Sequence, residues 1–165
     1  MLRTEVESQE TDFTESFTID VNDLRNESAS LVLRWAKTEV KVPMKVAVHE
    51  QAMANIDKAL EEGPADKKWQ VYRNAANYYY NNDLNLDQAL AYMEQSIAAK
   101  SDSWYSHWLN AEILAKKSEY DAAIKSAQRA LKAGEANAVK DGEEFSYANM
   151  IEESITEWKN KKKES

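Results

Sequence analysis

The sequence predicts an α+β protein that is mainly α-helical, with a small three-stranded antiparallel sheet followed by a short right-handed helical solenoid and a capping helix. Three observations predict it. Apolar residues alternate with period two in the first third of the chain, and from residue 49 they recur at about every 3.6 residues. Part of the helical region also repeats itself along the chain. We therefore expect a β-meander over residues 1–48 and a helical repeat domain over residues 49–165.

Composition narrows the possible functions. The chain has 165 residues, 43% of them hydrophobic, and a net charge of −8, which argues against a sequence-independent grip on nucleic-acid phosphates. It has no cysteine, so disulfides, thiolate zinc sites and cysteine nucleophiles are excluded. No stretch reaches the roughly 18 apolar residues of a membrane-spanning helix, and we expect no membrane span.

Three strands are expected, at residues 16–21, 30–35 and 39–48. In the first strand Phe17, Ile19 and Val21 share one face, which should be covered by helices or by further strands. The residues between the second and third strands are few enough for a hairpin. Pro43 lacks the N–H that a central strand donates, so the third strand should lie at an edge or carry a bulge.

The helical region divides into six expected helices. They cover residues 51–62, 67–82, 85–99, 101–117, 119–134 and 143–163. Gly63 and Pro64 should end the first of them, Ser101 or Asp102 should cap the fourth, and Gly134 is expected as the residue that ends the fifth. The last helix places Tyr147, Ile151, Ile155 and Trp158 on one face.

A repeat of helix pairs stands out within this region. Asp87, Ala89 and Leu90 recur as Asp121, Ala123 and Ile124, each 34 positions later. The chain resembles the tetratricopeptide-repeat family in this period and in the small residues at matching places: Ala76, Ala111, Ala89, Ala123, Ala127, Ser96 and Ala130. The resemblance implies paired helices stacked as a solenoid, with the helix carrying Phe145 and Trp158 as its cap. An unrelated antiparallel helix bundle is the alternative.

A second resemblance covers nearly the whole chain. The runs "FTIDV", "SASLVLRWAKTEVKVPMKV", "YRNAANYYYNND" and "AEILAKKSEYDAAI" are similar to the C-terminal half of an uncharacterised, mostly exported bacterial family, domain-of-unknown-function family twenty-nine-eleven. It implies a periplasmic or secreted location. Members usually carry a signal peptide and a preceding β-rich region, so the resemblance implies a short form or a fragment of a larger protein. That family has no established activity.

The tetratricopeptide resemblance implies a binding groove along the first helix of each pair. The predicted peptide-binding residues are Arg73, Asn77, Tyr80, Tyr105, Trp108, Glu112 and Lys116, with Gln70 and Asn81 on the same surface. Rings beside Arg and Asn are typical of peptide-binding hot spots. Alternatively, these rings pack against neighbouring helices. A clamp for a terminal carboxylate by Arg73 and Asn77 is a weaker interpretation, because Tyr105 and Leu109 stand where further polar residues would be expected.

The sequence shows no residue pattern for metal binding, phosphate binding or acid–base catalysis. His49 and His107 are the only histidines and show no metal-ligand spacing, so we expect no metal. No glycine-rich phosphate loop is present, and neighbouring acids such as Glu61 and Glu62 point in different directions from a helix. We expect no cofactor and no enzyme.

The sequence therefore favours a non-enzymatic module that binds a protein or peptide. The alternative is a structural role, in which missing strands or a partner chain complete the sheet, including a homodimer through its exposed face. An enzyme is the third and weakest interpretation, because no spacing of residues supports one.

Overall fold

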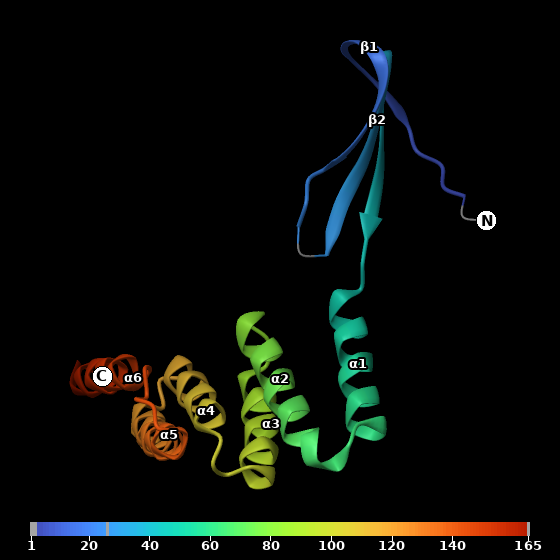
Figure 1. Ribbon diagram of the computed structural model, residues 1–165. Coiled ribbons are helices and arrows are strands. Elements are labelled where there is room, and N and C mark those ends of the chain that lie inside the picture. Colours follow the sequence, from blue (N-terminus) through green and yellow to red (C-terminus); the bar gives the residue numbers. More distant parts are fainter. Residues whose placement is uncertain (1–2, 26, 165) are drawn as a thin grey trace. The chain divides into compact units, whose positions relative to one another are not determined.

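The computed structural model describes residues 3–25 and 27–164, and the chain divides into two compact units that meet between Asn55 and Ile56. The first unit is built on a β-hairpin and the second is entirely helical (Figure 1). Of the residues that the structure describes, 61% are helical. The prediction of a mainly helical chain that begins with β-structure is correct at this level.

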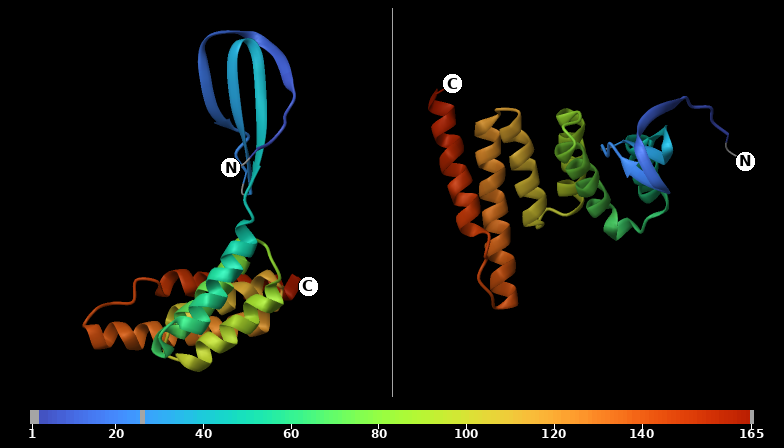
Figure 2. Two further views of the ribbon diagram at one scale, coloured as in Figure 1. Left: turned by 90° about the vertical axis from the view of Figure 1, so that its right-hand side faces the viewer. Right: turned by 90° about the horizontal axis from the view of Figure 1, so that it is seen from above.

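The first unit contains strand β1 (Ser8–Asn22) paired antiparallel with strand β2 (Ser28–Lys45). The two strands curve together as one ribbon that bends over on itself (Figures 1 and 2). Ala36, near the middle of β2, has a φ of +49°, which is unusual for a residue other than glycine. The ends of β2 come close enough for the Val46 N–H to donate to the Glu27 carbonyl at 3.0 Å.

The predicted three-stranded sheet is wrong, because the sheet has two strands. Residues 36–39, which we expected to link the second and third strands, belong to β2. They remain in the strand because Ala36 and Thr38 pair with Thr14 and Glu10 of β1. The predicted first strand was also too short, since β1 begins at Ser8. Its polar N-terminal half carries little apolar alternation, so the sequence pattern missed it.

The apolar face expected to be covered is exposed in this unit. Phe17 and Ile19 are 60% and 58% exposed, whereas Val32 is fully buried. Beside Val32, Arg34 donates to Asp20 at 2.8 Å and to the buried Glu39 at 2.6 Å. Hydrogen bonding from Gln9, together with Arg34, lowers the pKa of Glu39 although burial opposes this. The less exposed side of the hairpin is therefore polar as well as apolar.

The structure contains six α-helices and one short 3₁₀ helix in its described residues. They are α1 (Val48–Glu62), η1 (Ala65–Lys67), α2 (Lys68–Asn81), α3 (Leu86–Ala99), α4 (Trp104–Lys116), α5 (Tyr120–Asp141) and α6 (Ala148–Glu164). From α2 onward each helix packs on the next one along the chain (Figure 2). Ser103, rather than Ser101 or Asp102, caps α4, where its hydroxyl accepts from the Ser106 N–H.

Small residues hold these helices close together. Ala76, Ala89, Ala111, Ala123 and Ala127 are all fully buried. They lie in two clusters, one around Met93 and Leu109 between α2, α3 and α4, and one around Trp108 and Trp158 between α4, α5 and α6. A methyl side chain lets two helix backbones approach where a larger one would hold them apart. The repeated alanines of the sequence are therefore the packing positions of the helices.

The predicted end of the fifth helix at Gly134 is wrong. Helix α5 continues through Gly134 to Asp141, and its C-cap is Gly142 with a φ of +73°. Gly134 is buried, and a Cβ atom there would overlap the ring of Phe145. Its role is close approach to a neighbour, which local sequence cannot distinguish from helix termination.

None of the helices in the described ranges is both long and apolar enough to cross a membrane.

Candidate functional site

Helices α2 and α4 form the candidate site, because six of the seven predicted binding residues contact one another across these helices or lie together on their shared surface. Arg73 lies against Tyr105, and seven residues further along each helix Tyr80 lies near Glu112. The two helices therefore run in the same direction with matching residues opposite one another. We call this surface the α2–α4 face, defined by Arg73, Asn77, Tyr80, Tyr105, Glu112 and Lys116.

Arg73 is held between two aromatic rings. The guanidinium carbon lies 5.1 Å from the centre of the Trp69 ring and 5.3 Å from that of Tyr105. Its Nη2 atom lies 3.4 Å from the amide oxygen of Asn74, while Nε is buried and finds no hydrogen-bond acceptor among the described residues. Stacking fixes the orientation of the guanidinium and leaves donor capacity unused.

The backbone of Trp69 is held by a hydrogen bond from a buried hydroxyl group. The buried Ser96 hydroxyl of α3 donates to the Trp69 carbonyl at 2.9 Å and lies 3.2 Å from the hydroxyl of Ser106 in α4. Ser106 in turn donates to the Ser103 hydroxyl at 3.0 Å. This chain of buried hydroxyls links three helices at the base of the site, and fully paired networks of this kind make a local structure rigid.

At the other end of the face, Lys116 is occupied by internal partners. Its Nζ lies 4.9 Å from the centre of the Tyr80 ring, donates to the Tyr80 carbonyl at 3.3 Å and forms an ion pair with Asp83. Burial, and next the nearby Glu112, raises the pKa of the Tyr80 hydroxyl. The role predicted for Lys116, fixing the orientation of a peptide, is thus in competition with contacts inside the chain.

Glu112 differs from Lys116 in having no counter-charge. Its side chain is partly buried, and burial raises the pKa of the carboxyl. In the described part of the chain no Lys, Arg or His nitrogen lies within ion-pair distance of it. A partly desolvated carboxylate without a partner costs folding stability, and such groups are concentrated at functional sites.

Trp108, which we predicted as a binding residue, lies in the core and not on the face. It is only 7% exposed and stacks on Trp158 of α6, with ring centres 5.8 Å apart. Asn77 is half-buried on the face. The supplementary candidates Gln70 and Asn81 are exposed. Six of the seven predicted residues therefore remain accessible or partly accessible.

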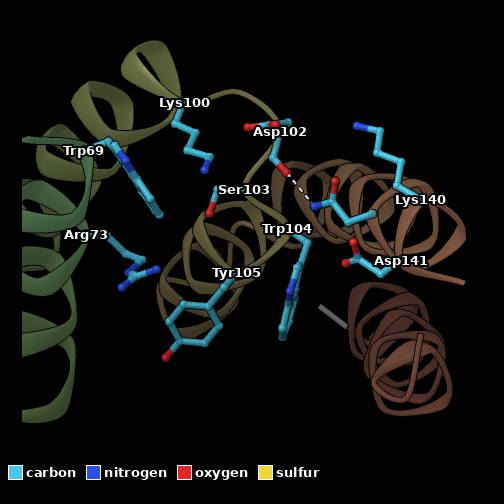
Figure 3. A pocket seen from close by; sticks show the side chains of 10 residues that line it. Trp69, Arg73, Lys100, Asp102, Ser103, Trp104, Tyr105, Lys140 and Asp141 are labelled. Atoms are coloured by element: carbon cyan, nitrogen blue, oxygen red, sulfur yellow. Dashed lines mark hydrogen bonds between the residues drawn. The ribbon is translucent and has the colours of Figure 1, made fainter. Parts of the chain in front are cut away.

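A pocket of about 480 Å³ adjoins the Arg73 end of the face (Figure 3). Arg73 and Tyr105 line it, as do residues that sequence reasoning did not assign to the site: Trp69, Lys100, Asp102, Ser103, Trp104, Asn137, Lys140 and Asp141. Trp69 and Trp104 occupy matching places in the repeat, and this correspondence is the sequence feature that could have assigned them to the site. The contribution of α5 could not be foreseen, because α5 was expected to end at Gly134.

Charges and rings are arranged unevenly around this pocket. The Lys100 ammonium lies 4.6 Å from the centre of the Trp69 ring. The Trp69 ring therefore makes cation–π contacts with both Arg73 and Lys100. Figure 3 places these two cations on one side, with Lys140 and Asp141 on the side formed by α5. Trp104 stacks on Tyr147 at 4.9 Å between ring centres, and the Asn137 amide donates to the Asp102 carbonyl at 3.1 Å.

Other expectations concerned metal binding and the histidines. In residues 3–25 and 27–164 no three His, Cys, Asp or Glu side chains are grouped so that they could hold a metal ion. His107 is buried in α4, with its Nε2 atom 2.9 Å from the Ser101 carbonyl. It packs inside the helices and does not reach the α2–α4 face.

Comparison with models of known protein families gives no match, and comparison with curated proteins gives no significant match either. The resemblances to the tetratricopeptide-repeat family and to domain-of-unknown-function family twenty-nine-eleven stay predictions. The geometry of the α2–α4 face is therefore the main evidence for a function.

Proposed function

We propose that this chain is a non-enzymatic module that binds a segment of another protein or a peptide on the α2–α4 face. The observation that carries the proposal is the Arg73 guanidinium, stacked between Trp69 and Tyr105 with a buried Nε that has no acceptor among the described residues. Preorganised aromatic and arginine side chains dominate the binding energy of many protein interfaces. The adjoining pocket offers room for a side chain of the bound segment.

A displayed library of random peptides tests this proposal. We expect enriched peptides whose affinity falls at least about tenfold, or about 1.4 kcal/mol, when Arg73→Gln is introduced. Arg129→Gln, in the exposed part of α5, is the matched control and should leave affinity unchanged. The Arg73→Gln variant must keep its circular dichroism spectrum. Failure to enrich any peptide, or equal binding by the two variants, would contradict the proposal.

A second candidate function is supported by the exposed apolar face of the hairpin. Phe13, Phe17, Ile19 and Trp35 are between 40% and 68% exposed, and Phe17 and Trp35 lie together with ring centres 6.1 Å apart. We infer that a second copy of the chain covers this face, since a two-fold interface needs only one self-complementary surface. The unpaired edge of a two-stranded sheet provides additional hydrogen-bonding groups.

Sedimentation velocity tests the second candidate. The native chain should sediment as a dimer at tens of micromolar, and Phe17→Ser together with Ile19→Thr should convert it to a monomer with the helical signal intact. Exposed Val139 on α5 supplies the control, because Val139→Thr changes an equally apolar residue elsewhere. A native chain that is monomeric at the highest attainable concentration would overturn this candidate.

A further inference from the structure

The α2–α4 face has charge of opposite sign at its two ends. At one end Arg73 and Lys100 lie against Trp69, and neither forms an ion pair with a carboxylate in the described residues. At the other end Glu112 has no cation beside it, because Lys116, one helical turn away, is paired with Asp83. Other charged side chains of the helical unit do form ion pairs within the chain, as Lys117 and Asp87 do at 2.6 Å.

These unsatisfied charges are unexpected in a chain with a net charge of −8. Such a chain has carboxylates in excess, so neutralising Arg73 and Lys100 internally would be easy. Asp102 and Asp141 do line the same pocket, but Figure 3 shows Asp141 on the α5 side, away from Arg73. Leaving two cations and one carboxylate unpaired on one face lowers stability and favours a ligand of complementary charge.

The distance between the two ends follows from helix geometry. Arg73 is opposite Tyr105, and Glu112 follows Tyr105 by seven residues on the same helix. Seven residues of α-helix span about 10.5 Å. In an extended strand, side chains of one face are about 7 or 13 Å apart. In a polyproline II segment, residues three positions apart lie on the same side and are separated by about 9 Å, which matches the span better.

We propose that the α2–α4 face binds a polyproline-II-like peptide segment in which an acidic and a basic residue are three positions apart, the acidic side chain at Arg73 and Lys100 and the basic side chain at Glu112. This inference depends on the proposed peptide-binding function and specifies its ligand. Tyr105 lies at the Arg73 end and Tyr80 at the Glu112 end, and the two rings supply flat surfaces for the proline rings of such a segment.

Neither charged end needs to move for this ligand to bind. The guanidinium of Arg73 is already held between two rings, so its free donors are preorganised for a carboxylate. Burial raises the pKa of Glu112, and a bound cation would reverse part of that effect by stabilising the ionised carboxylate. Lys116 stays paired with Asp83 and stacked on Tyr80, and its positive charge disfavours a basic side chain of the peptide at that position.

Titration with short synthetic peptides tests the charge pattern. The peptides carry the cores Glu-Pro-Pro-Lys, Lys-Pro-Pro-Glu, Glu-Pro-Pro-Glu and Lys-Pro-Pro-Lys, acetylated and amidated so that no terminal charge contributes. Binding is followed by NMR shifts of the Trp69 indole. We expect one of the two mixed-charge peptides to bind at least about tenfold tighter than both like-charge peptides, and its order of residues gives the direction of the bound chain.

A charge reversal makes the test specific to this site. Glu112→Lys should shift the preference to the Glu-Pro-Pro-Glu peptide by at least about tenfold. Glu94→Lys, on exposed α3, is the matched control and should leave the preference unchanged. Equal binding of all four peptides, no binding of any, or an unchanged preference in Glu112→Lys would overturn the inference. If library peptides bind the face without this charge pattern, the proposed function stands and only this inference fails.

Discussion

At the scale of single residues, the glycine at position 134 could either end a helix or allow close packing against a neighbouring side chain. Glycine near the end of an amphipathic pattern commonly ends a helix, yet here the helix continues and the missing side chain makes room for the ring of Phe145. Phe145 also meets Trp104 with ring centres 5.0 Å apart. The glycine therefore lets the segment that leads into α6 pack next to the candidate pocket.

We expect Gly134→Ala to destabilise the helical unit by about 1–3 kcal/mol, because the added methyl group overlaps the Phe145 ring. Helix propensity alone predicts the opposite sign, a gain of up to about 1 kcal/mol. Urea unfolding of the variant distinguishes the two. Repeating the substitution in a Phe145→Ala background is the control, since there the methyl group has space and the propensity gain should reappear.

Glu112 gives a second prediction at this scale, because burial raises the pKa of its carboxyl in the folded protein. The folded state then binds the proton more tightly than the unfolded state. The free energy of unfolding should therefore fall as pH rises from the ordinary carboxyl pKa through the raised one.

Replacing Glu112 with Gln should remove this decline. At neutral pH the variant should be more stable than the native protein by a few tenths to about 1 kcal/mol, measured by urea unfolding across pH 4–8. Glu94→Gln, at an exposed position of α3, is the control and should keep the native pH dependence. A variant less stable than the native chain at neutral pH would show that the carboxylate has a partner in solution.

At the scale of elements, α6 packs against α4 and α5 with Ile151, Ile155 and Trp158. This contact decides the position of Trp108, because the α6 side chain of Trp158 stacks on it. On the same helix, Tyr105 precedes Trp108 by three residues and Glu112 follows it by four, and both remain partly exposed. One helix thus carries core and candidate binding residues on neighbouring positions.

Trp108→Ala should destabilise the helical unit by about 3–5 kcal/mol, the usual cost of removing a buried tryptophan. Thermal unfolding of Trp108→Ala, Trp158→Ala and the double variant measures the coupling between the rings, which should be about 0.5–1.5 kcal/mol. A loss of peptide binding without loss of stability would return Trp108 to the binding surface and contradict its burial.

At the scale of the whole molecule, the two units differ in how their carboxylates respond to folding. In the hairpin unit, hydrogen bonding from Gln9 and the proximity of Arg34 lower the pKa of Glu39. In the helical unit, burial raises that of Glu112. The two shifts have opposite signs, so acid should affect the two units in opposite directions.

We expect the hairpin unit to lose stability as pH falls through the ordinary carboxyl range toward the lowered pKa of Glu39. The gain from Glu112 comes at higher pH, as pH falls from its raised pKa to the ordinary carboxyl value. Hydrogen exchange of amides in β1 and β2, compared with those in α2 and α4, measures the two separately. Glu39→Gln should abolish the acid sensitivity that Glu39 confers on the hairpin and leave the exchange of α2 and α4 unchanged.

The sequence by itself determined the helical character of the chain, the alanine positions where helices meet and most residues of the α2–α4 face, because these follow from periodicity and side-chain size. The link between two strands that it predicted at residues 36–39 was wrong. Pairing with β1 keeps residues 36–39 in a single strand, and only the register between strands shows this.

Tertiary structure alone decided what each exposed ring and each charge meets. Trp108 became core because α6 covers it, Lys116 became paired because Asp83 lies beside it, and Glu112 was left without a cation. These outcomes depend on contacts between residues more than 30 positions apart, which periodic patterns along one helix cannot contain. Local propensity fixes which face a side chain occupies, whereas packing fixes its partner.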